Sequence, residues 1–325
     1  MRRELRPDQI TRDDASVVTV GTFDGVHVGH RAVVRYLIER AEVRGGPATV
    51  LSFDPHPRAV LTGEEVSLLT TPTERADLLE DLGLDRFVLM PFTEAFSQIE
   101  APDYVRDVLV GQVGMQEIVI GYDHGFGKGR TGDADLLKKM APEHGFSVDV
   151  ISAQEVDEYG VVSSSTVRRV LREEGDAQQA EAMLGRPYAV SGSVERGAGR
   201  GRQIGFPTAN VRPGDARKLI PKVGVYAARV ALDEETERRP AMVNVGRRPT
   251  FDEEDVRVEA HLLNFEGDLY GQRLRVEFAQ RLRDERRFDG PDALAEQLSR
   301  DKARCEHVLT PSYEHPSAPS APSAT

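Results

Sequence analysis

The feature that most constrains the fold is a ten-residue turn, residues 21–30, which carries three glycines and two histidines. It follows a short apolar run, residues 17–20, that is typical of a buried strand. It leads into residues 31–44, where apolar residues recur at helical spacing. Free backbone N–H groups and the positive end of a helix dipole meet at such a junction, so the turn suits phosphate binding. His27 and His30 would donate hydrogen bonds to a polyphosphate there.

Residues 16 to about 185 alternate candidate strands with candidate helices. The candidate strands are residues 17–21, 48–53, 86–91, 117–121 and 147–151. One helix start is well marked, because residues 71–74 combine a capping Thr, a Pro in the first turn and a Glu three residues after the cap. Such alternation predicts an α/β fold with a doubly wound parallel sheet that binds ligands at the carboxyl ends of its strands. The segments expected to converge there are residues 21–30, 54–58 and 121–130.

The pattern changes after residues 185–187, and short strands punctuated by turns continue to about residue 280. The candidate strands are residues 188–195, 224–232, 241–245, 256–263 and 274–278. They predict a compact antiparallel barrel or sandwich, followed by a helix over about 291–308. The tail repeats Pro, Ser and Ala, cannot bury a core and is expected to be disordered. We therefore expect domains over residues 1–186 and 187–310, with a disordered tail over 311–325.

Composition excludes several classes of protein. A net charge of −12 on 325 residues argues against a general nucleic-acid or membrane-surface binder, which carries a basic face. No apolar run approaches the roughly 20 residues that span a bilayer, and the charged N-terminus has no apolar segment behind it. The single cysteine, Cys305, allows no internal disulfide and no cysteine-based zinc site. We expect a cytoplasmic protein with no nucleic-acid or membrane partner, either a monomer or a homo-oligomer.

A second motif, Gly-Phe-Pro-Thr-Ala-Asn at residues 205–210, lies in the β-rich half behind a Gly- and Arg-rich loop, residues 196–202. That loop alone fits a phosphate-binding loop and a flexible solvated turn equally well. Thr208 and Asn210 lie two apart, hence on one face of a strand, and offer neutral oxygens that suit a Mg²⁺ ion holding nucleotide phosphates. Glu259 lies opposite the apolar positions of its strand, where alternation alone indicates a solvated face.

The turn at residues 21–30 resembles the Gly-x-Phe-Asp-Gly-x-His-x-Gly-His signature of the adenylyltransferase module of bacterial FAD synthetases. Further stretches that resemble this module are residues 52–57, 69–72, 121–127 and 162–168. The resemblance implies catalytic roles for His27, His30 and Arg168. It implies nucleotide binding by Gly21, Phe23, Asp24, Gly29 and Ser164, and flavin binding by Asp123 and Phe126. The family often has arginine after the position of His124, where this chain has Gly125, and Lys128 and Arg130 are close enough in sequence to replace it.

Residues from about 187 to 306 resemble the riboflavin kinase module. The matching stretches are residues 205–210, 224–226, 244–251, 258–261, 269–271 and 282–288. The resemblance implies a six-stranded antiparallel barrel with a terminal helix. It implies that Glu259 accepts the proton of the flavin ribityl hydroxyl, that Thr208 and Asn210 hold Mg²⁺ and ATP, and that Arg283 lies near the flavin.

Together the two halves are similar to the bifunctional riboflavin kinase/FMN adenylyltransferase family. The resemblance implies ATP-dependent phosphorylation of riboflavin to FMN, then adenylylation of FMN to FAD with release of pyrophosphate, with Mg²⁺ as cofactor. One alternative is another nucleotidyltransferase, such as a cytidylyltransferase or a pantetheine-phosphate adenylyltransferase, but those enzymes lack such a β-rich half. A second is a non-catalytic flavin-binding sensor, against which the intact candidate residues argue. A third is nucleic-acid binding through residues 196–202, which the net charge disfavours.

Overall fold

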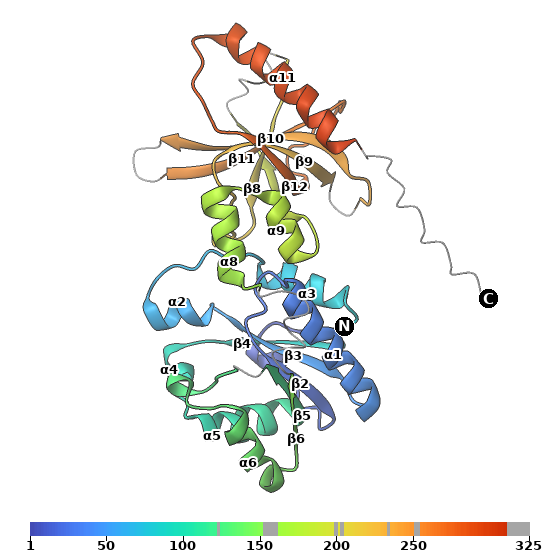
Figure 1. Cartoon of the computed structure of the whole chain (residues 1–325), viewed down its shortest axis with the longest axis vertical. Helices are drawn as coiled ribbons and strands as arrows, with labels where there is room; N and C mark the ends of the chain where they lie inside the picture. The colour runs from blue at the N-terminus through green and yellow to red at the C-terminus, as the bar shows by residue number, and fades with distance from the viewer. Residues whose placement is uncertain are drawn as a thin grey trace, which may run out of the picture. The chain divides into compact units, whose positions relative to one another are not determined.

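The computed structural model describes residues 1–121, 124–151, 162–197, 201, 205–232, 235–249 and 254–310 (Figure 1). Its contacts divide the chain into two compact units. The sheet unit comprises Met1–Glu174, Gln179–Arg186 and Asp215–Pro221, and the barrel unit comprises Gly175–Gln178, Pro187–Gly214 and the chain from Lys222 onward. Of the helices in the described ranges, none is long and apolar enough to cross a membrane.

The sheet unit is built on six parallel strands in the order β1-β4-β3-β2-β5-β6. They are β1 (Arg2–Glu4), β2 (Ser16–Val20), β3 (Ala48–Asp54), β4 (Arg86–Pro91), β5 (Met115–Gly121) and β6 (Ser147–Ile151). The five predicted strands are confirmed with small shifts at their ends. β1 was not predicted, because its charged sequence shows no apolar pattern. All six strands are parallel, but β3 and β4 are added on one side of β2, and β5 and β6 on the other. Ligands of such sheets bind at the carboxyl ends of the strands beside this switch point.

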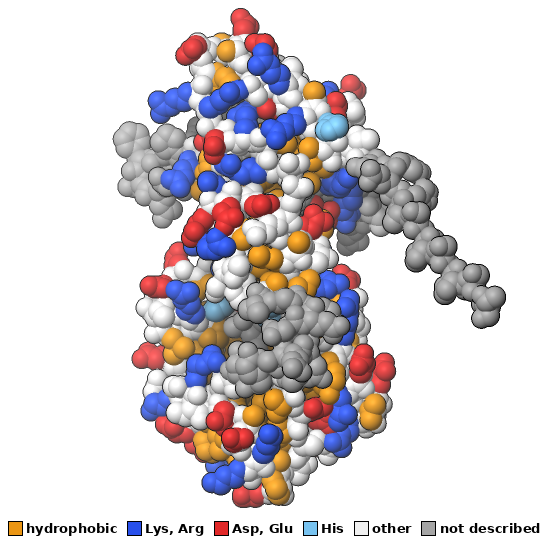
Figure 2. Space-filling view, viewed as in Figure 1, with side chains coloured by type: hydrophobic (Ala, Val, Ile, Leu, Met, Phe, Trp, Pro, Cys, Tyr) orange, Lys and Arg blue, Asp and Glu red, His pale blue; other side chains and the backbone are white. Residues whose placement is uncertain are grey.

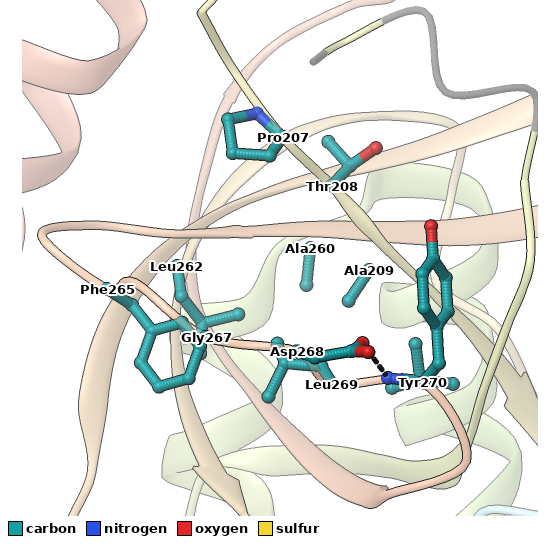
Figure 3. A pocket seen from close by; sticks show the side chains of 11 residues that line it. Pro207, Thr208, Ala209, Ala260, Leu262, Phe265, Gly267, Asp268, Leu269 and Tyr270 are labelled. Carbon is teal, nitrogen blue, oxygen red and sulfur yellow. Dashed lines mark hydrogen bonds between the residues drawn. The ribbon is translucent and has the colours of Figure 1, made fainter.

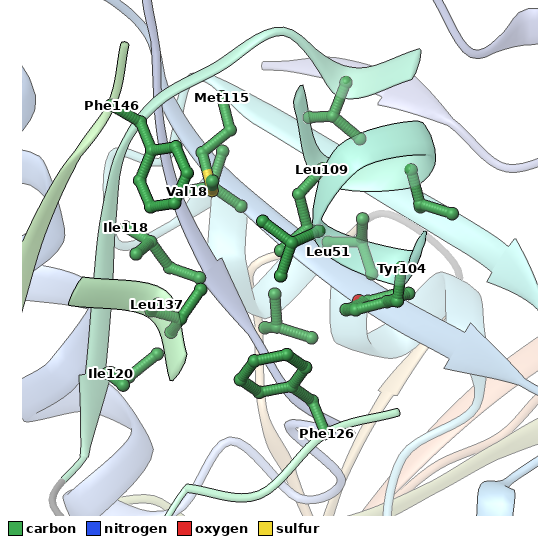
Figure 4. Close-up of a cluster of buried hydrophobic side chains, with 14 of the residues drawn as sticks. Val18, Leu51, Tyr104, Leu109, Met115, Ile118, Ile120, Phe126, Leu137 and Phe146 are labelled. Carbon is green, nitrogen blue, oxygen red and sulfur yellow. The ribbon is translucent and has the colours of Figure 1, made fainter. Parts of the chain in front are cut away.

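Helices cover both faces of this sheet, so the predicted doubly wound α/β class is confirmed. The main ones are α1 (Val28–Arg44), α3 (Pro72–Glu80), the π-helical segment η2 (Tyr104–Val113) and α6 (Ala134–His144). Neighbouring strand residues point to opposite faces. Val17 and Val50 pack with α1 and α3 in one core, while Val18 and Leu51 pack with η2 and α6 in the other (Figure 4).

Shorter helical segments complete the unit. They are η1 (Pro7–Gln9), α2 (Pro57–Thr62), α4 (Glu94–Ser97), α5 (Ala101–Asp103), η3 (Lys128–Arg130), α8 (Ser164–Arg169), η4 (Val170–Glu174) and α9 (Ala177–Leu184), whose first residues belong to the barrel unit. The predicted start of α3 is confirmed, because Thr71 and Glu74 form a reciprocal capping box. α1 begins at Val28, three residues before the predicted start at 31, because the His27 side chain caps it.

The barrel unit is a closed antiparallel barrel of six strands in the order β10-β11-β8-β7-β12-β9, as the resemblance implied. The strands are β7 (Tyr188–Glu195), β8 (Ala209–Pro213), β9 (Gly224–Leu232), β10 (Arg239–Pro249), β11 (Glu254–Leu262) and β12 (Arg273–Arg283). The predicted end of β12 at 278 was too early, since two register shifts near Gln280 and Leu282 interrupt its apolar alternation. Helix α11 (Pro291–Leu309) packs on β9, β10 and β12.

Charged side chains of both signs are interspersed over the visible surface of each unit, and no wholly basic face is seen in this view (Figure 2). The expected disordered tail, residues 311–325, lies outside the described residues.

Candidate active sites

In the sheet unit, α1 begins where the chain leaves the carboxyl end of β2, at the N-cap residue His27. The His27 Nδ1 atom accepts a hydrogen bond from the His30 backbone N–H at 3.3 Å, and the two imidazole rings stack with centroids 3.6 Å apart. The Phe23 ring contacts His30 at 4.9 Å between centroids. A helix start leaves backbone N–H groups without partners inside the helix, so this junction offers hydrogen-bond donors to an anion.

Both histidines are neutral at pH 7. Burial lowers the pKa of His27 to about 4, and the Arg186 charge adds to this although the Asp24 carboxylate opposes it. Burial, and then the neighbouring His27, hold the pKa of His30 well below its usual value. The buried His30 Nδ1 atom has no hydrogen-bond partner among the described residues. The pair therefore offers neutral N–H donors in place of positive charge.

Asp24 is fully buried, and its carboxylate is bonded to protein groups. It accepts hydrogen bonds from the backbone N–H groups of Leu69 and Thr70 at 3.1 and 2.8 Å and from the Thr70 hydroxyl at 3.0 Å. Burial opposes ionisation of Asp24, but Arg75, Arg168 and the two backbone N–H groups outweigh it and lower its pKa. The structure thus places Asp24 as an anchor for the loop over residues 67–70.

Arg168 and Ser164 reach the same turn from α8. The Arg168 Nη2 atom lies 2.5 Å from Asp24 Oδ2, and its Nε donates to the Ser67 carbonyl at 2.9 Å. The Ser164 hydroxyl donates to the Asp24 carbonyl at 2.9 Å. Two predicted glycines also lie here, since a Cβ at Gly21 would contact Phe23 at 3.1 Å and one at Gly29 would contact His27 at 3.4 Å. The structure therefore brings together all the described residues predicted for this nucleotide site.

An aromatic pocket of about 380 Å³ opens beside the turn, at the carboxyl edge of the sheet. Its lining includes Gly21, Thr22, Phe53, Phe92, Phe96, Tyr104, His124, Gly125, Phe126 and Arg130. Phe126, a predicted flavin residue, is part of this wall. Asp123, the other one, lies outside the described residues. A Cβ at Gly125 would lie 3.0 Å from Arg130 Nε, so the Arg130 side chain occupies the space next to Gly125.

In the barrel unit, strand register aligns the predicted residues in one cross-strand row. Glu259 on β11 pairs with Asn210 on β8 and with Asn244 on β10. Asn244 pairs with Val225 on β9, which in turn pairs with Arg283 on β12. Directly opposed residues have Cβ atoms about 5 Å apart and point to the same face. Glu259 and Asn210 are therefore immediate neighbours.

Two pockets adjoin this row. The barrel pocket, of about 400 Å³, lies between the barrel and α11 and is lined by Gly201, Phe206, Thr208, Val225, Met242, Asn244, Glu259, His261, Arg283, Glu285, Arg286, Phe288, Leu294 and Leu298. The smaller loop pocket is lined mainly by residues 207–209 and 265–270, and Thr208 lines both (Figure 3). The face that carries Glu259 is thus covered by α11, where alternation alone indicated solvent, because the pattern of one strand does not show what packs on it.

The segment that carries Thr208 is held by His261. The His261 Nδ1 atom lies 2.7 Å from the Pro207 carbonyl, and its ring contacts Phe206 with centroids 5.3 Å apart. Burial lowers the pKa of His261, and the bond to Pro207 partly offsets this. A Cβ at Gly197 would collide with the Asn210 amide. Much of the predicted 196–202 loop lies outside the described residues.

Arg283 lies in the wall of the barrel pocket and is paired with α11. Its Nε and Nη2 atoms lie 2.8 and 2.7 Å from Asp301 Oδ2, and Asp301 is buried. Gln297 donates to the other Asp301 oxygen at 2.7 Å. Arg283 also stacks over Phe288, with its guanidinium carbon 5.8 Å from the ring centroid. The predicted flavin residue therefore also fixes the helix that closes the pocket.

The oxygen ligands that the barrel unit offers fit a Mg²⁺ ion that arrives bound to a nucleotide. Within the part of the chain that the structure describes, no group of three or more His, Cys, Asp or Glu side chains could hold a metal. Mg²⁺ bound to ATP needs only one or two protein ligands, because phosphates and waters supply the rest. The oxygens of Thr208 and Asn210 meet this requirement.

Sequence reasoning missed several residues around the sheet-unit site. Arg75 is fully buried and donates to the Ser52 hydroxyl at 2.7 Å, while the Ser52 hydroxyl donates to the Thr22 carbonyl. Thr70 joins Asp24 to Gly25, whose backbone N–H donates to the Thr70 hydroxyl at 2.9 Å. The capped helix start at 71–74 and the family-like stretches 52–57 and 69–72 marked this region, but none of them indicates contact with Asp24.

The two units thus define a two-domain transferase class, with a nucleotidyltransferase-type parallel sheet and a barrel that carries a polar cross-strand row. The FAD synthetase family profile matches residues 9–166, and the riboflavin kinase profile matches residues 184–309. The chain is 37% identical to a bifunctional riboflavin kinase/FMN adenylyltransferase of Pseudomonas fluorescens, over 95% of this chain and 96% of that one. The enzyme of the same name from Escherichia coli K12 is 38% identical over 89% and 91% of the two chains.

A crystal structure from Streptococcus pneumoniae, titled a macrolide-efflux protein, superposes with a TM-score of 0.83. The sequences are 30% identical, and the match covers 94% of this chain and 98% of that one. The chain belongs to the bifunctional riboflavin kinase/FMN adenylyltransferase family, and it carries the domains for both activities.

Proposed function

We propose that the barrel unit phosphorylates riboflavin to FMN and that the sheet unit then adenylylates FMN to FAD, with one ATP consumed in each step. The observation that carries this proposal is that each unit places a pocket for a planar ring beside groups suited to phosphate chemistry. In the sheet unit Gly21 belongs both to the aromatic pocket and to the turn before α1. In the barrel unit Glu259 and Thr208 line one pocket. Because both steps use ATP, the cytoplasm is the compartment we propose.

In the first step Glu259 accepts the proton of the terminal ribityl hydroxyl of riboflavin as that oxygen attacks the γ-phosphorus of ATP. The bond from the γ-phosphorus to the β-phosphate oxygen breaks, and ADP leaves. Thr208 lines both the barrel pocket and the loop pocket, so we assign the flavin to the former and the adenine to the latter. Thr208 and Asn210 would hold Mg²⁺, which neutralises phosphate charge when bound.

In the second step a phosphate oxygen of FMN attacks the α-phosphorus of ATP, and pyrophosphate leaves as the bond to the β-phosphate breaks. A phosphate dianion is already a nucleophile at neutral pH, so no strong base is required. His27 and His30 donate hydrogen bonds to the ATP phosphates, and Arg168 holds the departing pyrophosphate. Catalysis then depends on in-line positioning and on donors aimed at developing charge.

The flavin ring of FMN fits the aromatic pocket, because its planar surface suits stacking on side chains such as Phe53 and Phe126. Arg130 supplies a cation at the rim of this pocket, over Gly125. We propose that Arg130 takes the place of a side chain at position 125 in contacting the FMN phosphate.

Incubation of the full chain with riboflavin, ATP and Mg²⁺, with the flavins separated by chromatography over time, tests the proposal. We expect FMN first and FAD later. FMN without FAD would refute the role of the sheet unit. If neither product forms, FMN is supplied directly: FAD formation would then confine the failure to the barrel unit, and its absence would favour a non-catalytic flavin-binding protein.

A further inference from the structure

A short segment within the predicted barrel domain belongs to the sheet unit. Residues 215–221, here called the strap, connect β8 to β9 in sequence, yet their contacts are with the sheet unit. The strap pairs with Leu68: the Leu68 N–H donates to the Arg217 carbonyl at 2.7 Å, and the Leu219 N–H donates to the Leu68 carbonyl at 2.8 Å. Two backbone bonds thus fix the strap to the loop over residues 67–70.

The strap adds two cationic side chains to this loop. The buried Lys218 ammonium donates to the Leu69 carbonyl at 2.6 Å and to Glu74 Oε2 at 2.7 Å. Arg217 lies 2.7 Å from Asp54 Oδ1, at the carboxyl end of β3. Lys218 therefore ties the loop to the first turn of α3, and Arg217 ties the strap to the edge of the sheet where ligands bind.

The same loop contacts Asp24 and Arg168, which the family resemblance places in the nucleotide site. Both backbone polar groups of Leu69 are hydrogen-bonded: its N–H donates to Asp24, and its carbonyl accepts from Lys218. Ser67 accepts from Arg168 through its carbonyl at 2.9 Å. A displacement of this loop would therefore move both Asp24 and Arg168.

Burying a lysine in the segment that connects two strands carries a free-energy cost. Removing an ammonium group from water is strongly unfavourable unless good partners compensate it, and an apolar side chain of similar size would pack at lower cost. What Lys218 adds over an apolar residue is a directed hydrogen bond to Leu69 and an ion pair with Glu74. Its chemistry is thus suited to positioning the loop.

We propose that the strap is part of the adenylyltransferase site and that Lys218 is a positioning residue for ATP, acting through the loop over residues 67–70. This inference rests on the proposed function of the sheet unit. The strap lies in the part of the sequence that resembles the riboflavin kinase module, yet it thereby contributes to the adenylyltransferase site of the sheet unit.

The test compares wild-type and Lys218→Met full-length protein in steady-state FAD formation from FMN and ATP. We expect KM for ATP to rise roughly tenfold, and KM for FMN to stay within about twofold because the aromatic pocket is formed by other elements. FMN formation from riboflavin should also stay within about twofold of wild type. An unchanged KM for ATP in folded Lys218→Met protein overturns the inference. A fall of both activities with both KM values unchanged marks a general loss of folded protein, and Arg217→Ala then decides.

Two further variants complete the experiment. Arg217→Ala removes a half-exposed side chain and tests the strap if Lys218→Met does not fold: we expect KM for ATP to rise about threefold, and no change would count against the strap. Arg212→Ala on β8 is the matched control, because its exposed side chain pairs with the exposed Glu195 on β7, and it should match wild type. If wild-type protein forms no FAD from FMN, the proposed function itself fails.

Discussion

The imidazole rings of His27 and His30 are only 3.6 Å apart by centroid, and two cations at that separation would repel each other strongly. Both pKa values are lowered, so the pair acts at neutral pH through N–H donors and the first turn of α1. The positive charge near the turn comes from arginines. Arg168 faces Asp24, and Arg186 donates to the carbonyls of Gly25 and Val26.

The pKa of His27 predicts a pH dependence of stability. The folded pKa of about 4 lies below the ordinary histidine pKa of 6.5, so between these pH values the unfolded chain binds a proton that the folded chain does not. Stability is therefore retained above pH 6.5 and falls as the pH drops toward 4. Between pH 7 and 4.5, we expect the free energy of unfolding of the wild type to fall by roughly 2–3 kcal/mol more than that of His27→Gln. Hydrogen exchange of α1 amides, corrected for intrinsic rates, measures this, and equal losses would contradict it.

Glu259 provides the sharpest functional prediction for a single residue. Glu259→Gln keeps the size of the side chain and its place beside Asn210 but removes the proton acceptor. We expect riboflavin phosphorylation to fall by about 10²-fold or more, as general-base removal typically does. FAD formation from supplied FMN should remain near wild type. Parallel assays of the two steps measure this, and an equal fall in both would contradict the assigned role.

At the scale of elements, local patterns predicted what depends on local contacts. The strand pattern located five sheet strands, and the capping pattern located the start of α3. The pattern failed at β1, whose partner β4 lies more than 80 residues away, and at the register shifts in β12. Spacing suggested Asn210 as a Mg²⁺ ligand, and the family resemblance alone gave Glu259 a role. Their adjacency follows from pairing of β8 with β11, which no single strand specifies.

Helix α11 yields a prediction at this scale. The buried pair between Arg283 and Asp301 fixes α11 over the barrel pocket, and breaking a buried pair by removing one partner typically costs about 3–5 kcal/mol. Asp301→Ala should therefore lower the stability of the barrel unit and raise KM for riboflavin, with FAD formation from FMN preserved. Thermal unfolding and steady-state assays measure these effects.

Glu306→Ala on the exposed side of the same helix is the matched control. It should change neither the unfolding temperature nor KM for riboflavin appreciably, because exposed charges contribute little to stability. If Asp301→Ala behaves like Glu306→Ala, the pair does not position α11.

At the scale of the whole molecule, sequence order and contacts disagree in one place. The predicted change of pattern after residues 185–187 is where β7 begins, yet the strap joins the sheet unit. Its contacts are of long range, since Lys218 and Glu74 are 144 residues apart. A periodic pattern reports the face that a segment buries and not its partner, so neither the strap nor the bond between Arg168 and Asp24 was predictable.

We propose that one chain performs two successive transfers of different phosphorus atoms of ATP. The most direct measurement supplies riboflavin, Mg²⁺ and ATP labelled at either the γ- or the α-phosphorus, and follows the label into separated flavins. We expect γ-label in FMN and later in FAD, and α-label in FAD alone. Label from the α-position in FMN, or FAD that carries no α-label, would contradict the claim.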